Sequence, residues 1–189
     1  MGKTYIAPVA EKGAGKGLFV EILKKLLPKK RVLMIQSSDF WKQILGTLCK
    51  EESRKNMDIV ATALRTAFLD DGILNIPLKK AMGSADADVI VLDGLRKPEE
   101  VRPIKDMGGC VVFISAKPDI RFQRRKEHAE KTDEHNMTFE QFVLQDDLPS
   151  NRTIRSIGET MTDIQIENNG TVEDFEAVIK KFLQEHGVA

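Results

Sequence analysis

Short apolar runs alternate along the chain with longer segments whose apolar residues recur every three or four positions. The first run, Thr4 to Val9, leads into a charged, glycine-rich stretch, after which apolar residues follow at helical spacing from Leu18 to Leu27. This order predicts a strand, a loop and a helix. Further short apolar runs predict strands at Val32 to Ile35, Asp88 to Asp93, Gly109 to Ser115 and Asp163 to Glu167.

The segments between these strands carry helical patterns. Helices are expected from about Pro98 to Met107 and from Val172 to Glu185. The apolar spacing in residues 39–82 predicts an insert of several helices. Residues 118–158 are polar and charge-dense, and we expect this segment to be mobile. Strands that alternate with helices predict an α/β fold of three layers, in which helices cover both faces of a five-stranded parallel sheet.

The composition is that of a folded domain with no bulk charge. The 189 residues are 41% hydrophobic, and Lys plus Arg equals Asp plus Glu at 29 each. We therefore expect one domain over residues 1–189 and no nucleic-acid partner. The absence of a signal-peptide core or a long apolar run predicts a cytoplasmic protein without a membrane partner. Cys49 and Cys110 lack zinc-ligand spacing, which predicts buried free thiols.

A glycine-rich stretch, Ala10-Glu-Lys-Gly-Ala-Gly-Lys-Gly17, lies between the first predicted strand and helix. In that position glycines let successive backbone N–H groups point inward, and the helix adds the positive end of its dipole. Lys16 would then reach the terminal phosphates of ATP. The alternative is an ordinary strand-to-helix turn with a solvated lysine.

The stretch departs from the general phosphate-loop pattern G-x-x-x-x-G-K-[ST], because Ala10 replaces the first glycine and Gly17 replaces the magnesium-binding hydroxyl. A glycine after the lysine resembles adenylate kinase and its relatives, although these usually place threonine where this chain has Leu18. The resemblance implies bound ATP and Mg²⁺. The ATP-binding residues that it implies are Gly13, Ala14, Gly15, Lys16, Gly17 and Leu18.

Asp93 is the candidate magnesium ligand, directly or through a water molecule. It closes a continuous apolar run, and ligands bind beyond the carboxyl ends of strands in open parallel sheets. The alternative role is a cap of the following turn.

Two segments resemble the acceptor-binding parts of nucleoside monophosphate kinases. Asp39 and Lys42 match the place where an aspartate opens a helix and an arginine holds the acceptor's phosphate. Asp93-Gly-Leu-Arg96 resembles the DG-x-R stretch of a branch that includes dephospho-CoA kinase-like archaeal proteins and a phage deoxynucleoside monophosphate kinase, and Arg65 matches an LR position of that branch. The alternatives are a helix N-cap for Asp39, a surface pair with Glu99 or Glu100 for Arg96, and a solvated helix arginine for Arg65.

Arginines gather in the charge-dense segment, at Arg121, Arg124 and Arg125 and again at Arg152 and Arg155. Such a set suits a helical lid that closes on ATP, with Arg121 and Arg125 as catalytic residues beside Lys16 and Asp93. The alternative is a self-paired, solvated helical arm. Asn168, in an NNG stretch, resembles the position near the purine in this family, or forms a simple turn.

Together these features predict a P-loop kinase that transfers the terminal phosphoryl group of ATP to a small phosphorylated acceptor, a nucleoside or deoxynucleoside monophosphate. Transfer to a hydroxyl, as in dephospho-CoA kinase, is one alternative, and a non-catalytic ATP-binding regulatory module is another. The expected partners are small-molecule nucleotides, and the chain would act as a monomer or a homodimer.

Overall fold

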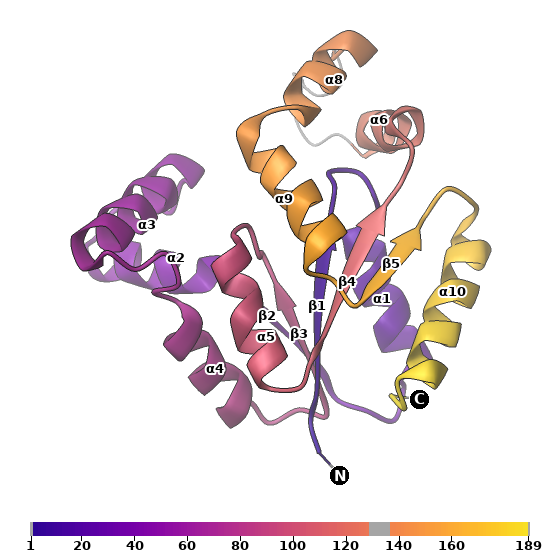
Figure 1. Ribbon diagram of the computed structural model, residues 1–189, viewed down its shortest axis with the longest axis horizontal. Helices are drawn as coiled ribbons and strands as arrows, with labels where there is room; N and C mark the ends of the chain where they lie inside the picture. Colours follow the sequence, from indigo (N-terminus) through magenta and orange to yellow (C-terminus); the bar gives the residue numbers. More distant parts are fainter. Residues whose placement is uncertain (1, 129–136, 189) are drawn as a thin grey trace. The chain divides into compact units, whose positions relative to one another are not determined.

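The computed structural model describes residues 2–128 and 137–188 and contains a five-stranded parallel sheet in the order β2-β3-β1-β4-β5 (Figure 1). The strands are β1 (Thr4–Ala10), β2 (Val32–Gln36), β3 (Val89–Asp93), β4 (Cys110–Ser115) and β5 (Ile164–Glu167). Each of them overlaps a strand predicted from the sequence. The predicted α/β fold class is confirmed.

Strand β3 shows why the apolar runs became strands. It pairs in parallel with β1, where Thr4 lies opposite Val89, and with β2, where Val32 lies opposite the same residue. Its residues from Val89 to Leu92 have no exposed surface. A strand with neighbours on both edges and protein on both faces has to be apolar throughout, which accounts for the continuous run.

The helices fall where the periodic segments predicted them. Those up to β4 are α1 (Lys16–Leu26), α2 (Ser38–Thr47), α3 (Arg54–Phe68), α4 (Asn75–Ser84), the 3₁₀ helix η1 (Pro98–Val101) and α5 (Arg102–Asp106). Those after β4 are α6 (Pro118–Glu127), α8 (Phe139–Asp146), α9 (Pro149–Thr160) and α10 (Val172–Glu185). The predicted helix from Pro98 to Met107 is divided into η1 and α5 because Pro103, near the start of α5, has no N–H for a continuous helical ladder.

By its internal contacts the chain divides into two compact units. The first unit comprises residues 1–7 and 31–110, and the second comprises residues 8–30 and 111–189. The first therefore contains β2, β3 and the helices from α2 to α5, and the second contains α1, β4, β5 and the helices from α6 onward.

The core of the second unit is built on both faces of its strands. On one face, α1 packs against α10 through the Phe19 ring, whose centroid lies 6.5 Å from that of Phe175 and 6.3 Å from that of Phe182. On the other face, α9 crosses β4 so closely that a Cβ on Gly158 would lie 2.4 Å from the Phe113 ring (Figure 1). The end of the segment predicted to be mobile is thus packed on the sheet.

The prediction of buried thiols was wrong. Cys49 is exposed and Cys110 is half-buried. Helix α2 ends at Thr47, and Cys49 then adopts a left-handed φ of 52°, so the chain has already left the helical register that buries Trp41 and Leu45. None of the helices in the described residues is long and apolar enough to cross a membrane.

Candidate nucleotide and acceptor sites

The phosphate loop, residues 10–17, joins the end of β1 to the start of α1 in the second unit, as the sequence predicted. Its backbone turns at Gly13 and Gly15, which have φ values of 80° and 103°. The Ala14 N–H donates to the Glu11 carbonyl at 3.1 Å, which closes the turn. Helix α1 has no acidic residue in its first turn and no side-chain cap. Its first N–H groups and dipole therefore favour an anion.

Glycine is required at two positions of this loop. A Cβ on Gly13 would lie 2.7 Å from the Arg121 carbonyl oxygen, and one on Gly15 would lie 2.5 Å from Nδ2 of Asn168. Gly17 differs, because a Cβ there would meet no atom within 4 Å among the described residues. The missing hydroxyl at position 17 is therefore not imposed by packing.

Asn168, which follows β5, fastens this loop. The residue is 2% exposed, and its Nδ2 donates to the Ala14 carbonyl at 2.9 Å. Its backbone carbonyl accepts from Nη1 of Arg124 at 2.9 Å. The amide predicted to lie near a purine is thus directed to the phosphate loop, so its contact in this structure is with protein.

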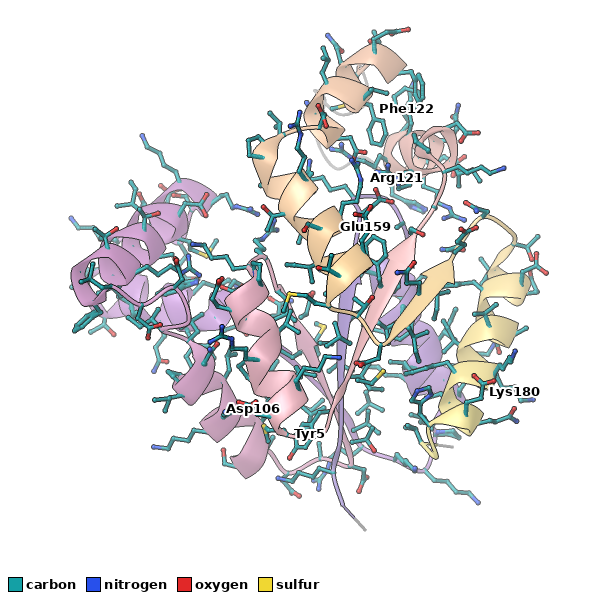
Figure 2. The ribbon with its side chains drawn as sticks, viewed as in Figure 1. Tyr5, Asp106, Arg121, Phe122, Glu159 and Lys180 are labelled. Carbon is teal, nitrogen blue, oxygen red and sulfur yellow. The ribbon has the colours of Figure 1, made fainter. Side chains whose placement is uncertain are left out.

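Arg121 is almost completely buried, with 1% of its surface exposed. Figure 2 shows where its side chain lies at α6. Its Nη1 and Nη2 donate to the two carboxylate oxygens of Asp146 at 2.7 and 2.8 Å, and its Nε donates to the Ala116 carbonyl at 2.9 Å. Its guanidinium also lies 5.4 Å from the Phe142 ring centroid. Arg121 therefore ties α6 to the end of β4 and to α8.

A second arginine completes this charged cluster. Arg155 on α9 donates from Nη2 to Oδ2 of Asp146 at 2.9 Å and from Nε to Oε1 of Glu11 at 3.2 Å. Burial alone would raise the pKa of Asp146, but the hydrogen bond and charge of Arg121, with the charges of Arg155 and Lys12, lower it below its ordinary value. The cluster therefore holds a carboxylate in its ionised form. Of the other predicted lid arginines, Arg125 lies over the Phe142 ring, 5.9 Å from its centroid.

In the first unit, the turn after β3 is held against the start of α2. Gly94 has a φ of 90°, and its carbonyl accepts from the Ser37 hydroxyl at 2.8 Å. The Ser37 N–H donates to the Asp93 carbonyl at 2.9 Å. The Asp93 backbone and the Asp39 helix are thus fixed to each other, as an acceptor site built from both segments requires.

Asp39 and Lys42 lie together in α2. The Lys42 Nζ donates to Oδ1 of Asp39 at 2.9 Å, which raises the pKa of the lysine. The N-cap of this helix is Ser37, so the alternative of Asp39 as an N-cap is wrong. Asp39 lies in the first turn of α2, where its negative charge interacts favourably with the positive end of the helix dipole.

Arg65 and Glu100 organise the DG-x-R stretch. Nη2 of Arg65 donates to Oε1 of Glu100 at 2.7 Å, and the guanidinium lies 5.4 Å from the Trp41 ring centroid. Oε2 of Glu100 accepts the backbone N–H of Arg96 at 2.7 Å and that of Lys97 at 3.2 Å. The alternative of Arg65 as a solvated helix arginine is therefore wrong.

Glu100 is a residue of this turn that the sequence did not predict to be buried. Only 3% of its surface is exposed, and it accepts the backbone N–H of Arg96, so it is not an exposed surface partner of that arginine. The overlooked signal was local: Lys97 is an N-cap, Pro98 follows it, and a glutamate at the third helical position can accept the N-cap N–H.

The Arg96 side chain reaches solvent yet stands among protein atoms on several sides. The pKa of its guanidinium is lowered, mainly because burial disfavours the charged form and also because of the positive charge of Arg54. The negative charges of Asp58, Glu100 and Asp93 raise this pKa but do not reverse the shift. The Arg96 guanidinium thus lies among charges of both signs.

Asp93, the predicted magnesium ligand, is the last residue of β3. Within residues 2–128 and 137–188, no group of three or more His, Cys, Asp or Glu side chains could hold a metal ion. A single carboxylate fits Mg²⁺, which commonly takes one or two carboxylates and completes its shell with phosphate oxygens and water.

The chain resembles known proteins in sequence and in fold. A protein of Thermococcus kodakarensis described as a UPF0200 protein is 26% identical over 154 residues, which cover 75% of this chain and 82% of the relative. No protein-family model matches the sequence.

Solved structures of two shikimate kinases and of an uncharacterised protein share the fold. The shikimate kinase of Acinetobacter baumannii, in complex with shikimate, has a TM-score of 0.56 at 14% identity, covering 99% of this chain and 96% of its own. The shikimate kinase of Aquifex aeolicus has a TM-score of 0.57 at 16% identity, covering 98% of this chain and 99% of its own. An uncharacterised protein of Eubacterium ventriosum has a TM-score of 0.59 at 12% identity, covering 96% of this chain and 99% of its own. The chain thus shares the fold of these structures.

Proposed function

We propose that this protein is an ATP- and magnesium-dependent phosphotransferase whose acceptor is a nucleoside or deoxynucleoside monophosphate. The observation that carries the proposal is the phosphate loop, with two left-handed glycines directly before a helix that begins at Lys16 and lacks both a cap and first-turn acids. Such a loop offers backbone N–H groups and one lysine to a polyphosphate.

The donor-binding residues of this proposal lie in the second unit. They are Gly13, Ala14, Gly15, Lys16, Gly17 and Leu18, with Asn168 holding the loop. Lys16 would neutralise charge on the terminal phosphates, and Arg125 would approach from α6. Arg121, given its bonds to Asp146 and to backbone carbonyls, would act by placing α6 rather than by touching the nucleotide.

The acceptor-binding residues lie in the first unit. Arg96 and Lys42 supply positive charge to an acceptor phosphate, while Arg65, through Glu100, sets the position of the Arg96 backbone. A phosphate acceptor is itself the nucleophile and needs no general base, because phosphoryl transfer depends mainly on alignment and charge neutralisation. Asp93 would hold Mg²⁺ directly or through water, and the metal would supply further charge neutralisation.

Two observations support a hydroxyl group as an alternative class of acceptor. Asp39 carries a carboxylate beside Lys42, and the shikimate kinases share the fold. A hydroxyl acceptor, as in dephospho-CoA, would use Asp39 or Asp93 to take its proton. We propose further that the units act as one kinase domain in the cytoplasm, as a monomer or homodimer, on small molecules without nucleic acid or membrane.

The test is ADP release from ATP and Mg²⁺ with a panel of nucleoside and deoxynucleoside monophosphates, and with dephospho-CoA and shikimate as hydroxyl acceptors. Turnover that requires one monophosphate, and that Lys16→Ala abolishes, supports the proposal. Turnover with a hydroxyl acceptor alone would replace the acceptor class. ATP binding without turnover on any acceptor would favour the regulatory module.

A further inference from the structure

The phosphate loop contains a negative side chain. Glu11 is the second residue of the loop, and its side chain is 11% exposed. A carboxylate in a loop that binds a polyphosphate repels its ligand, and partial burial strengthens that repulsion because less water screens it. A loop of this kind needs a fixed positive charge against Glu11.

Two arginines approach this carboxylate, and their geometry separates their roles. Nη2 of Arg121 lies 3.4 Å from Oε1 of Glu11, but the guanidinium is already bound through two hydrogen bonds to Asp146. Nε of Arg155 donates to the same Glu11 oxygen at 3.2 Å. Arg155 is therefore the hydrogen-bonded counter-charge of Glu11.

In the hydrogen-bonded part of this cluster two guanidinium groups meet two carboxylates, and the charge of Lys12 also acts on Asp146. Arg155 is 36% exposed, whereas the side chains of Arg121, Asp146 and Glu11 are 2%, 11% and 11% exposed. Removing Arg155 would make the charge of this largely buried cluster, which includes the phosphate loop, more negative by one unit. Removing the charge of Glu11 would make it more positive by one unit.

We propose that Arg155 is a positioning residue that keeps the phosphate loop able to bind polyphosphate, by neutralising Glu11 rather than by contacting the ligand. This inference rests on the proposed ATP site. It makes the Glu11–Arg155 pair a determinant of phosphate affinity whose two members act with opposite signs.

The test is calorimetric titration of ATP with Mg²⁺ into the wild type, Arg155→Met, Glu11→Gln and the double variant. We expect Arg155→Met to weaken binding by about tenfold to a hundredfold. Glu11→Gln should tighten binding by a similar factor. The double variant should bind within about threefold of the wild type, because opposite charge changes offset each other.

The control is Arg152→Met. Arg152 lies on the same helix and forms the same kind of pair with Asp147, but both side chains are more than half exposed, at 64% and 57%. It should leave ATP affinity within about twofold, because surface pairs are screened by water. Urea unfolding of each variant separates lost binding from lost folding.

Direct contact between Arg155 and the nucleotide would give a different pattern. If Arg155 contacts the nucleotide and Glu11 does not repel it, Glu11→Gln would not tighten binding, and the double variant would remain as weak as Arg155→Met. Either result would overturn the inference, as would unchanged affinity in Arg155→Met. If Arg155→Met does not fold, Glu11→Gln alone decides, because only tightened binding agrees with repulsion by Glu11.

Failure of the proposed function would look different again. A wild-type protein that does not bind ATP would contradict the kinase proposal. The same four proteins titrated with inorganic tripolyphosphate, which presents only the anion, would then test the charge pattern of the loop. Loss of that pattern in a protein that binds the anion would contradict the inference alone.

Discussion

Arg65 and Glu100 form an ion pair that is largely removed from water, with Nη2 of the arginine 2.7 Å from Oε1 of the glutamate and side-chain exposures of 15% and 4%. The pair joins α3 to the turn that carries Arg96, since the other oxygen of Glu100 accepts the N–H groups of Arg96 and Lys97. The helical insert and the DG-x-R stretch are thereby one structural element.

This pair predicts a large loss of stability for Glu100→Ala. The substitution would leave the Arg65 charge and two backbone N–H groups without their acceptor, and breaking a buried pair costs about 3–5 kcal/mol. The matched control is Asp71→Ala, because Asp71 pairs with Lys97 of the same turn at 2.7 Å but is exposed. Urea unfolding should give a clearly smaller loss for the control. Equal losses of unfolding free energy in the two variants would mean that the buried pair stabilises the protein no more than the exposed pair does.

The charged cluster of Arg121, Arg155, Asp146 and Glu11 predicts that the stability of the protein depends on pH. The folded pKa of Asp146 is lowered, mainly by Arg121 against the cost of burial, so the folded protein resists protonation more than the unfolded chain does. The contribution is therefore fully present above the ordinary value of 3.8 and is lost as pH falls through the lower folded value. The gap in unfolding free energy between wild type and Asp146→Asn should narrow as pH falls from about 5 to about 3. A gap that stays constant or widens over this range would contradict the assignment.

Gly17 offers a gain-of-function test of the phosphate loop. Its Cβ position is open and it lies in the first turn of α1, so Gly17→Thr should fold and gain up to about 0.5 kcal/mol from helix propensity. If the loop binds Mg-ATP, the new hydroxyl should lower the Mg²⁺ concentration needed for half-maximal turnover. The contrasting variant is Gly15→Ala, which places a Cβ 2.5 Å from Asn168 Nδ2 at a φ of 103° and should lose stability. A higher Mg²⁺ requirement in Gly17→Thr would count against the loop's role.

The elements that could be predicted are those whose structure depends on residues close together in the sequence. The strand from Val89 to Asp93 needs only its own apolar run, and the turn at Gly13 and Gly15 only its glycines and the helix that follows. Helix α10 was predicted from Val172 to Glu185, as observed, because its period and flanking turn are local.

The partners of charged residues could not be predicted in the same way. Arg121 meets Asp146, and Arg155 meets Glu11, across long stretches of chain whose packing no local period encodes. The same limit applies to Asn168, whose amide reaches Ala14 from the end of β5. A charged helix looks solvated in sequence whether its arginines face water or a buried carboxylate.

The final prediction concerns Arg96, which separates acceptor binding from ATP binding. Its backbone is fixed by Glu100, and its side chain is exposed, so its guanidinium could donate charge-assisted hydrogen bonds to an acceptor phosphate. Arg96→Ala should therefore raise the acceptor KM or lower kcat/KM for the acceptor by about tenfold to a hundredfold, which corresponds to roughly 1.5–3 kcal/mol. ATP affinity should barely change, because the residues proposed to bind ATP belong to the other unit.

Two further measurements decide this assignment. Arg96→Lys should recover only part of the loss, because lysine supplies charge without the planar fork of the guanidinium. Arg102→Ala, a substitution of an exposed arginine in the same unit, is the matched control and should leave the acceptor dependence unchanged. Calorimetry of ATP beside steady-state kinetics with the identified acceptor gives both readings. Weakened ATP binding with an unchanged acceptor KM would place Arg96 at the donor, and no change in either would leave it as a surface residue.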